Sequence, residues 1–343
     1  MAAPLKLKRQ QTAQKLKSNS AVADQLPVAA VLVDTPVSHL EGIYDYLVPL
    51  HLENSAVYGT KVVVPFGNTQ VDGLVVGRKN ESDQIKKLKM ITDISSPSGL
   101  ISKQVMEHLE LVRNRFGGSF WNLLRSALPA RIAKEEKVIE DTKFQANAND
   151  YESPQHRDLI GRSDYGMLVG KQRLKWAVNL PVGISSNDFI NEIVKLRAQT
   201  GQVLVIVPDE KDLLILRKDL SVFFGKSYLE MGTHLGKSER YRNFLTARFT
   251  KPSLILSTRS GVFTALEENS TVIVLSDLDQ SHYEQHSPGW NTRDVSLLRS
   301  KDTSLIFISA SHSLEISRLI EIGWLEKKNY RSKNGIQIMT AEN

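Results

Sequence analysis

The sequence contains no cysteine among its 343 residues. Disulfide bonds, thiolate nucleophiles, iron–sulfur clusters and cysteine-type zinc sites are therefore excluded. Long apolar runs are also missing: the longest, such as Val28–Val33 and Val203–Val207, fall far short of the roughly 20 residues that span a bilayer. The basic, polar N-terminus is not followed by the apolar segment of a secretory signal. We therefore expect a cytoplasmic protein without a membrane partner.

What is present is the composition of a globular protein. Apolar residues make up 41% and charged residues 24% of the chain, which argues against wholesale disorder and collagen-like structure. At roughly 150 residues per domain, the length predicts about two domains and is ample for a buried core.

Positive charge is concentrated at the N-terminus. Residues 1–27 hold five basic side chains against Asp24 alone, a balance of +4, so the other 316 residues share +2 of the net charge of +6. A basic tail before a near-neutral body suits contact with the phosphates of nucleic acid, and a solvated, disordered start is the alternative. We expect residues 1–26 to form a basic disordered tail. Its basic residues are Lys6, Lys8, Arg9, Lys15 and Lys17.

After this tail the pattern becomes β-rich. Four short runs rich in β-branched residues are separated by polar, glycine or proline residues, which predicts strands. The turn after the third run contains Gly67 and Asn68, which tolerate the positive φ that hairpins need. We therefore predict a small, mostly antiparallel β domain. The runs are Val28–Asp34, Tyr44–Pro49, Thr60–Phe66 and Val71–Gly77.

A helical pattern follows the strands. Apolar residues recur at steps of three or four from Ile101 to Phe116, and Gly117 and Gly118 end the pattern. A second, shorter helix is expected around Trp121. Residues 131–165 then become charged and polar, which is typical of a linker between domains.

From about residue 166 continuous apolar runs alternate with helical patterns. Such runs fit strands that are buried on both faces of a parallel sheet, and their alternation with helices indicates a doubly wound α/β lobe. One helix is expected to begin near Pro208. The runs are Val203–Val207, Ser253–Ser257, Thr271–Leu275 and Ser304–Ser309.

An α/β lobe often carries a phosphate-binding loop, but the sequence lacks one. Such a loop needs glycines, a lysine that reaches the phosphates and a Ser or Thr on Mg²⁺. At the expected place the chain reads Leu180–Ser186 (LPVGISS), with one glycine and no lysine. We therefore expect that this loop does not hold ATP in the usual way.

The acidic pair that would hold Mg²⁺ is weak as well. After Thr271–Leu275 come Asp277 and Asp279, which would point to opposite sides if the strand continued. These aspartates together with His282 and His286 have a spacing that a metal site can use, because the histidines would share a helix face. A polar loop is the favoured interpretation, since Pro and Gly follow at once, and we expect no metal site. No spacing indicates a nucleophilic triad.

Taken together, several motifs resemble the PriA family of primosomal replication-restart proteins. Tyr44–Pro49 (YDYLVP) is similar to its Phe-Asp-Tyr-Leu-x-Pro, and Val62–Gly67 (VVVPFG) to its Val-Arg-Val-Pro-Phe-Gly. In the second half, Ser257–Ser260 (STRS) resembles Gly-Thr-Arg-Ser, and Ile308–Glu315 (ISASHSLE) a changed form of Gly-Ser-Ala-Thr-Pro-Ser-Leu-Glu. The ordered set runs from about residue 27 to 325.

The resemblance implies a domain organisation and a fold class. It implies a 3′-end DNA-binding domain at 27–130, the linker at 131–165, one degenerate RecA-like helicase lobe at 166–330 and a tail at 331–343. The fold is then α/β, with an antiparallel β-rich domain before a parallel-sheet lobe. The family's Gly-Ser-Gly-Lys-Thr and Asp-Glu-Glu-His motifs are replaced, which leaves a degenerate nucleotide site. Its residues are Gly183, Ser185, Ser186, Ser276 and Asp277.

Carried over position by position, the family's pocket for a 3′ end falls on Tyr44, Asp45, Gly67 and Lys89. An aromatic face can stack on a terminal base, a carboxylate can accept a hydrogen bond from a free 3′-hydroxyl, and a lysine can meet a phosphate. Each residue also has a plain structural interpretation: a core tyrosine, a turn aspartate, a hairpin glycine and a solvated lysine.

These expectations combine into a non-catalytic DNA-binding protein of replication restart. It would recognise forked or branched DNA through a 3′ end, without ATP, Mg²⁺ or another cofactor. Primosome proteins and single-stranded-DNA-binding proteins are possible partners. The alternatives are a residual ATP-dependent 3′-to-5′ helicase and a vestigial interaction module.

Overall fold

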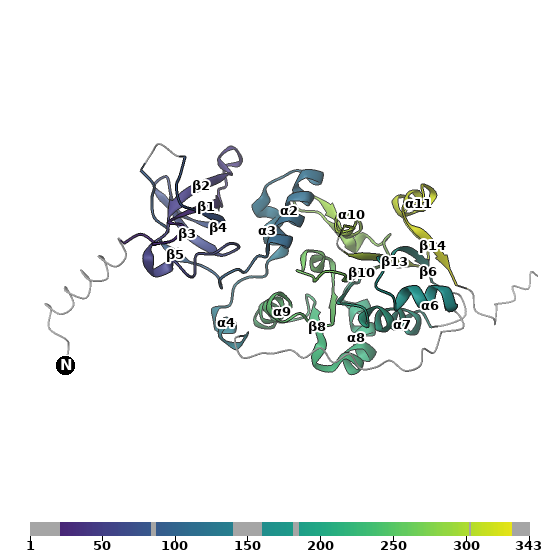
Figure 1. Cartoon of the computed structure of the whole chain (residues 1–343). Coiled ribbons are helices and arrows are strands. Elements are labelled where there is room, and N and C mark those ends of the chain that lie inside the picture. The colour runs from purple at the N-terminus through teal and green to yellow at the C-terminus, as the bar shows by residue number, and fades with distance from the viewer. Residues whose placement is uncertain (1–20, 84–86, 140–159, 181–184, 302, 331–343) are drawn as a thin grey trace, which may run out of the picture. The chain divides into compact units, whose positions relative to one another are not determined.

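The computed structural model describes residues 21–83, 87–139, 160–180, 185–301 and 303–330 (Figure 1). The candidate Gly183, the tail at 331–343 and most of the tail at 1–26 therefore lie outside the described residues. The chain forms two compact units, and the boundary between them lies between Glu107 and His108. The first unit contains an antiparallel sheet and the second a parallel sheet.

The sheet of the first unit has five antiparallel strands in the spatial order β2-β1-β4-β3-β5. The predicted β-rich domain and its hairpin are confirmed: β3 and β4 are joined at Gly67 and Asn68, and Gly67 adopts a φ of +60°. The strands are β1 (Val28–Val33), β2 (Ile43–Leu47), β3 (Lys61–Phe66), β4 (Thr69–Lys79) and β5 (Asp93–Ile94).

The segment that leads into β5 closes this sheet on itself. The N–H of Leu47 in β2 donates to the carbonyl of Lys89 at 2.9 Å, and the N–H of Ile91 donates back to the carbonyl of Leu47 at 3.0 Å. The next residue, Thr92, donates to the carbonyl of Val63 in β3 at 2.9 Å. Because one segment pairs with both β2 and β3, these strand edges are not left open.

Alternate residues of the strands point to the inside of this closed sheet. In β3, Val62 and Val64 are fully buried, whereas their neighbours are partly exposed. In β2, Tyr44 and Tyr46 contact the apolar core, so Asp45 between them faces the other side. The core consists of Ala23, Ala29, Val31, Val33, Tyr46, Val48, Leu52, Ala56, Val62, Val64, Val75 and Ile91.

Three helices follow β5 in the chain. The predicted amphipathic helix is α2 (Lys103–Phe116), and the left-handed residues Gly117 and Gly118 end it at φ values of +77° and +82°. The shorter helix is α3 (Phe120–Ala127). The charged start of the predicted linker forms α4 (Ala133–Ile139).

Helix α4 is held to α9 (Lys237–Thr250) by polar contacts within the second unit. The Arg242 guanidinium pairs with Glu135 at 2.7 Å, and the Tyr241 hydroxyl donates to Glu136 at 2.8 Å. The charged pattern of this stretch therefore serves a helix–helix contact.

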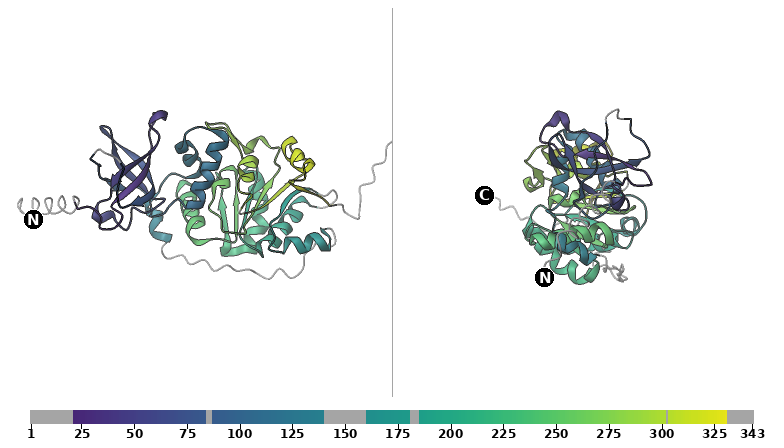
Figure 2. Two further views of the ribbon diagram at one scale, coloured as in Figure 1. Left: turned by 45° about the horizontal axis from the view of Figure 1, so that its top comes forward. Right: turned by 90° about the vertical axis from the view of Figure 1, so that its left-hand side faces the viewer.

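The sheet of the second unit has seven parallel strands in the order β14-β6-β13-β10-β7-β9-β8, which lie between helices (Figure 2). The four predicted apolar runs are β7, β9, β10 and β13, buried along their whole lengths, so the predicted parallel α/β lobe is confirmed. The strands are β6 (Lys175–Asn179), β7 (Val203–Ile206), β8 (Tyr228–Met231), β9 (Leu254–Ser257), β10 (Thr271–Leu275), β13 (Ser304–Ser309) and β14 (Glu326–Asn329).

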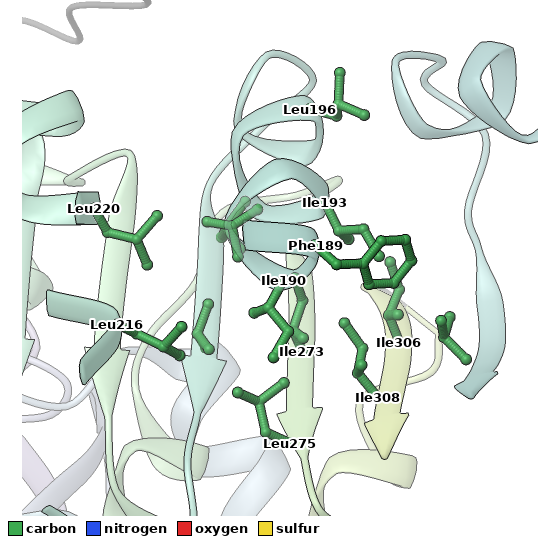
Figure 3. Close-up of a cluster of buried hydrophobic side chains, with 14 of the residues drawn as sticks. Phe189, Ile190, Ile193, Leu196, Leu216, Leu220, Ile273, Leu275, Ile306 and Ile308 are labelled. Carbon is green, nitrogen blue, oxygen red and sulfur yellow. The ribbon is translucent and has the colours of Figure 1, made fainter. Parts of the chain in front are cut away.

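The main core of the second unit lies on one face of this sheet. Figure 3 shows Phe189 and Ile193 of α7 above Ile273 of β10 and Ile306 of β13. The strand residues of the other parity are also buried, so both faces are covered. Besides α3, α4 and α9, the helices of this unit are α6 (Arg162–Leu168), α7 (Ser186–Ala198), α8 (Glu210–Phe224), α10 (Thr292–Leu297) and α11 (Leu314–Glu321). A two-stranded ribbon pairs β11 (Tyr283–Glu284) with β12 (Trp290–Asn291). No helix in the described part of the chain is long and apolar enough to cross a membrane.

Candidate functional site

Three of the four residues predicted to hold a 3′ end lie in a connected cluster at one end of the closed sheet. The ring of Tyr44 meets the ring of Phe66 edge to face, with 5.1 Å between centroids. Phe66 precedes the hairpin residue Gly67, whose carbonyl accepts a hydrogen bond from the Lys89 ammonium at 3.0 Å. We call Tyr44, Phe66, Gly67 and Lys89 the hairpin cluster.

The hairpin cluster combines a fixed aromatic with an accessible cation. Tyr44 is partly buried, and its hydroxyl donates to the carbonyl of Leu40 at 3.0 Å, which restrains the ring. Gly67 and Lys89 are exposed. A Cβ at Gly67 would meet no atom within 4 Å, so glycine is favoured there by its left-handed backbone and not by crowding.

Asp45 does not join this cluster. Its carboxylate accepts a hydrogen bond from Ser82 at 2.5 Å and pairs with the Lys79 ammonium at 2.8 Å on the other face of β2. The hydrogen bond to Asp45 raises the pKa of Lys79. Only 7% of the Asp45 side chain is exposed, so these partners cover it.

Sequence reasoning named no role for Phe66, Lys79 or Ser82. The alternation of β2 was a usable signal, because neighbours in a strand point to opposite faces and Tyr44 and Asp45 cannot share one. The partners of Asp45 had no such signal, since Ser82 lies in a loop 37 positions away.

The described residues of the predicted degenerate nucleotide site lie at the carboxyl edge of the parallel sheet. Ser185 caps α7 by accepting a hydrogen bond from the N–H of Asp188 at 3.3 Å, and Ser186 is the first residue of that helix. Across this edge, Ser276 follows β10 with a φ of +52°, and its N–H donates to the carbonyl of Ile308.

The carboxylate of Asp277 lies at this edge, and both of its oxygens contact other residues of the chain. The His312 ring lies 2.8 Å from one carboxylate oxygen, and the N–H of Ser313 donates to the other at 2.8 Å. Burial would raise the pKa of Asp277, but the hydrogen bonds from His312 and Ser313 outweigh it and hold the pKa below its usual range. The carboxylate is thus charged and internally paired.

Two features of this edge count against the usual arrangement for Mg²⁺ and ATP. Both oxygens of Asp277 are engaged, and the Leu180–Ser186 stretch supplies no lysine for phosphates. The rival metal arrangement is not formed either, because His282 and His286 do not share a helix. Among the described residues, no group of three or more histidine or acidic side chains is placed to hold a metal ion.

The two histidines have separate environments. His282 is buried and its ring nitrogen bonds the carbonyl of Leu275 at 2.8 Å; burial lowers the pKa of His282, so the ring is neutral at pH 7. His286 is exposed beside Glu284. The arginines of the neighbouring motifs are also used internally: Arg259 pairs with Glu284 at 2.9 Å and Arg293 with Glu315 at 3.0 Å.

Comparison with known proteins bears on the first part of the chain most directly. Residues 30–129 match a family model described as the PriA 3′DNA-binding domain (3′BD). Over 302 residues the chain is 30% identical to the probable replication restart protein PriA of Mycobacterium tuberculosis (strain CDC 1551 / Oshkosh), which covers 84% of this chain and 45% of that protein. The chain is a relative of PriA.

The chain is also similar to another PriA protein and to a solved structure. The probable replication restart protein PriA of Mycobacterium leprae (strain TN) is 27% identical over 84% of this chain and 46% of its own length. The chain thus spans about half the length of these PriA relatives. A structure of RecG bound to a three-way DNA junction matches 69% of this chain and 30% of RecG, with 14% identity and a TM-score of 0.37.

Proposed function

We propose that this chain binds forked or branched DNA in replication restart and recognises the 3′ end of a nascent strand through its first unit. The observation that carries the proposal is the match of residues 30–129 to the PriA 3′DNA-binding domain. The hairpin cluster supports it, because Lys89 is hydrogen-bonded to Gly67 there and Tyr44 contacts Phe66, the residue before Gly67.

The hairpin cluster has the chemistry that a strand terminus requires. The restrained Tyr44 ring offers a surface for a terminal base, and stacking of this kind contributes about 1–3 kcal/mol per base. Lys89 supplies a positive charge to a phosphate, and Gly67 lets the backbone approach closely. Water can replace the hydrogen bond that the Lys89 ammonium now donates to the Gly67 carbonyl, since both residues are exposed.

Asp45 enters the proposal through the family resemblance. A 3′-hydroxyl that donates to its carboxylate must replace the bond from Ser82 or Lys79. The proposal therefore assigns base stacking and phosphate contact to the hairpin cluster, and gives Asp45 the discrimination between a 3′-hydroxyl and a blocked end.

We also propose that DNA binding is not coupled to ATP-driven unwinding. The pairing of Asp277 with His312 and Ser313, together with the missing loop lysine, supports this part. Primosome proteins and single-stranded-DNA-binding proteins are the partners that such a role would require.

The test is the affinity of the full chain for two forked DNAs that differ only in a 3′-hydroxyl or 3′-phosphate on the nascent strand. We expect about tenfold tighter binding of the hydroxyl form, equivalent to about 1.4 kcal/mol. Tyr44→Leu and Lys89→Gln should weaken binding of both forks, whereas Asp45→Asn should remove the preference. Fluorescence anisotropy measures each value.

Lys103→Gln is the matched control for Lys89→Gln, because it removes one exposed positive charge elsewhere in the first unit. Equal affinity for the two ends would overturn 3′-end recognition. Absence of any preference for a fork over a plain duplex would favour the vestigial module.

A further inference from the structure

A cavity in the second unit gathers two arginines outside the site described above. Its volume is about 180 Å³, and it lies between the end of α3, the loop after β8 and helix α9. Arg125 comes from α3, Arg240 and Phe244 from α9, and Thr233 from the loop after β8. The volume is below the roughly 300–1,000 Å³ of pockets for drug-sized ligands, so the cavity suits a small charged group.

Arg240 is held in place without being neutralised. One terminal nitrogen donates to the carbonyl of Thr233 at 2.9 Å and lies 3.5 Å from that of Leu235. Its Nε is buried and has no hydrogen-bond partner among the described residues. A buried N–H without an acceptor destabilises the folded chain, and an oxygen atom of a ligand would satisfy it. Within the described chain, Arg240 forms no ion pair with a carboxylate.

The surroundings of the cavity favour an anion. Helix α9 has 14 residues, and Gly236 at its start provides no side-chain cap, so the amide groups of its first turn add positive potential. Two carboxylates flank the loop and have partners of their own. Glu210 accepts a hydrogen bond from the Thr233 hydroxyl at 2.6 Å and contacts His234. Glu230 contacts His234 and pairs with Arg217 at 3.6 Å.

We propose that this cavity binds a backbone phosphate of DNA, as a second contact separate from the hairpin cluster. The guanidinium groups of Arg125 and Arg240 hold the phosphate oxygens, and the hydroxyls of Ser126 and Ser260 complete the polar wall. The proposal rests on the proposed DNA-binding function. One wall, from Arg125 to Pro129, is the end of the stretch that matches the 3′DNA-binding domain, and the other belongs to the α/β lobe.

Each phosphate contact adds to the salt dependence of binding, so loss of this contact should lower that dependence even while the Lys89 contact remains. The affinity of the full chain for a labelled oligo-dT single strand should fall with log salt at a slope of about −0.7 per phosphate contact. Arg125→Gln with Arg240→Gln should weaken binding at least fivefold and reduce the magnitude of this slope by about 0.7, the share of one phosphate contact. Lys218→Gln with Lys226→Gln is the control, because it removes two exposed charges of the same unit that do not line the cavity.

The outcomes separate this proposal from the proposed function. The double arginine variant should keep its preference for a 3′-hydroxyl over a 3′-phosphate fork, because the cavity is distinct from the hairpin cluster. An unchanged salt slope overturns the phosphate contact while leaving 3′-end recognition standing. If the double arginine variant no longer bound polyglutamate but bound oligo-dT as tightly as the wild type, the cavity would be assigned to an acidic protein partner. That result would also overturn the phosphate contact. Circular dichroism at each stage excludes unfolded variants.

Discussion

Asp277 and His312 are 35 positions apart, and their side chains meet because β10 and β13 are adjacent parallel strands. The sequence showed that Asp277 follows an apolar run and that its neighbours are not those of a magnesium site. It did not show the partner, because that depends on which strands pair. The same holds for Asp45, whose partner Ser82 is brought in by a loop.

The Asp277 pair predicts a pH-dependent stability. The pKa of Asp277 in the folded chain lies below its ordinary value of 3.8. Its contribution is therefore complete above about pH 4 and is lost as the pH falls through the folded pKa. We expect Asp277→Asn to lower the free energy of unfolding by about 2 kcal/mol at pH 7, because charge-assisted hydrogen bonds are weakened. Urea unfolding between pH 3 and 7 measures the difference.

The difference between wild type and Asp277→Asn should narrow below pH 4. A gap that stays constant down to pH 3 would contradict the assigned charge state. Asp24→Asn, at an exposed position of the first unit, is the control and should change stability little at any pH.

At the scale of elements, local patterns located the strands and helices with strong signals. The continuous apolar runs became the central strands β7, β9, β10 and β13. The sequence pattern did not predict the edge strands. Strand β14 has the sequence Glu-Lys-Lys-Asn, which carries no strand signal, and its position depends on pairing with β6. Helix α4 was also missed, because its two glutamates contact α9 across about 105 positions of sequence.

Helix α8 carries the element-scale prediction. Asp209 accepts hydrogen bonds from the N–H groups of Lys211 at 2.8 Å and Asp212 at 3.1 Å. Asp209→Ala should therefore lower the free energy of unfolding by about 1 kcal/mol. Ser119→Ala at the start of α3 is the matched control, because Ser119 forms no side-chain cap bond and its loss should cost little. Equal losses in urea unfolding would contradict the assigned cap.

At the scale of the whole molecule, the chain consists of two units of different architecture. The closed antiparallel sheet presents the hairpin cluster, and the parallel sheet presents an edge at which Asp277 is paired internally. Under the proposed function, DNA binding depends on these fixed surfaces and not on a nucleotide-driven change of state.

The whole-molecule prediction is that ATP has no effect. We expect calorimetry to detect no Mg²⁺-dependent ATP binding, and the affinity of the full chain for forked DNA to stay within twofold when Mg-ATP is added. The physical reason is that Asp277 is occupied and the loop before α7 has no lysine. Fork-stimulated ATP hydrolysis would instead support the residual-helicase alternative. Mg²⁺ with ADP serves as the ionic control.

The sequence by itself determined the class of each part: alternating β-branched residues made an antiparallel sheet, and continuous apolar runs made a parallel one. It also determined which chemistry is missing, since an absent cysteine or loop lysine needs no fold to be noticed. Only the tertiary structure decided which side chains meet. Closure of the first sheet brought Lys89 to Gly67, a loop brought Ser82 to Asp45, and strand order brought His312 to Asp277. Local patterns depend on neighbours in the chain, whereas sites are made by residues that only pairing and packing bring together.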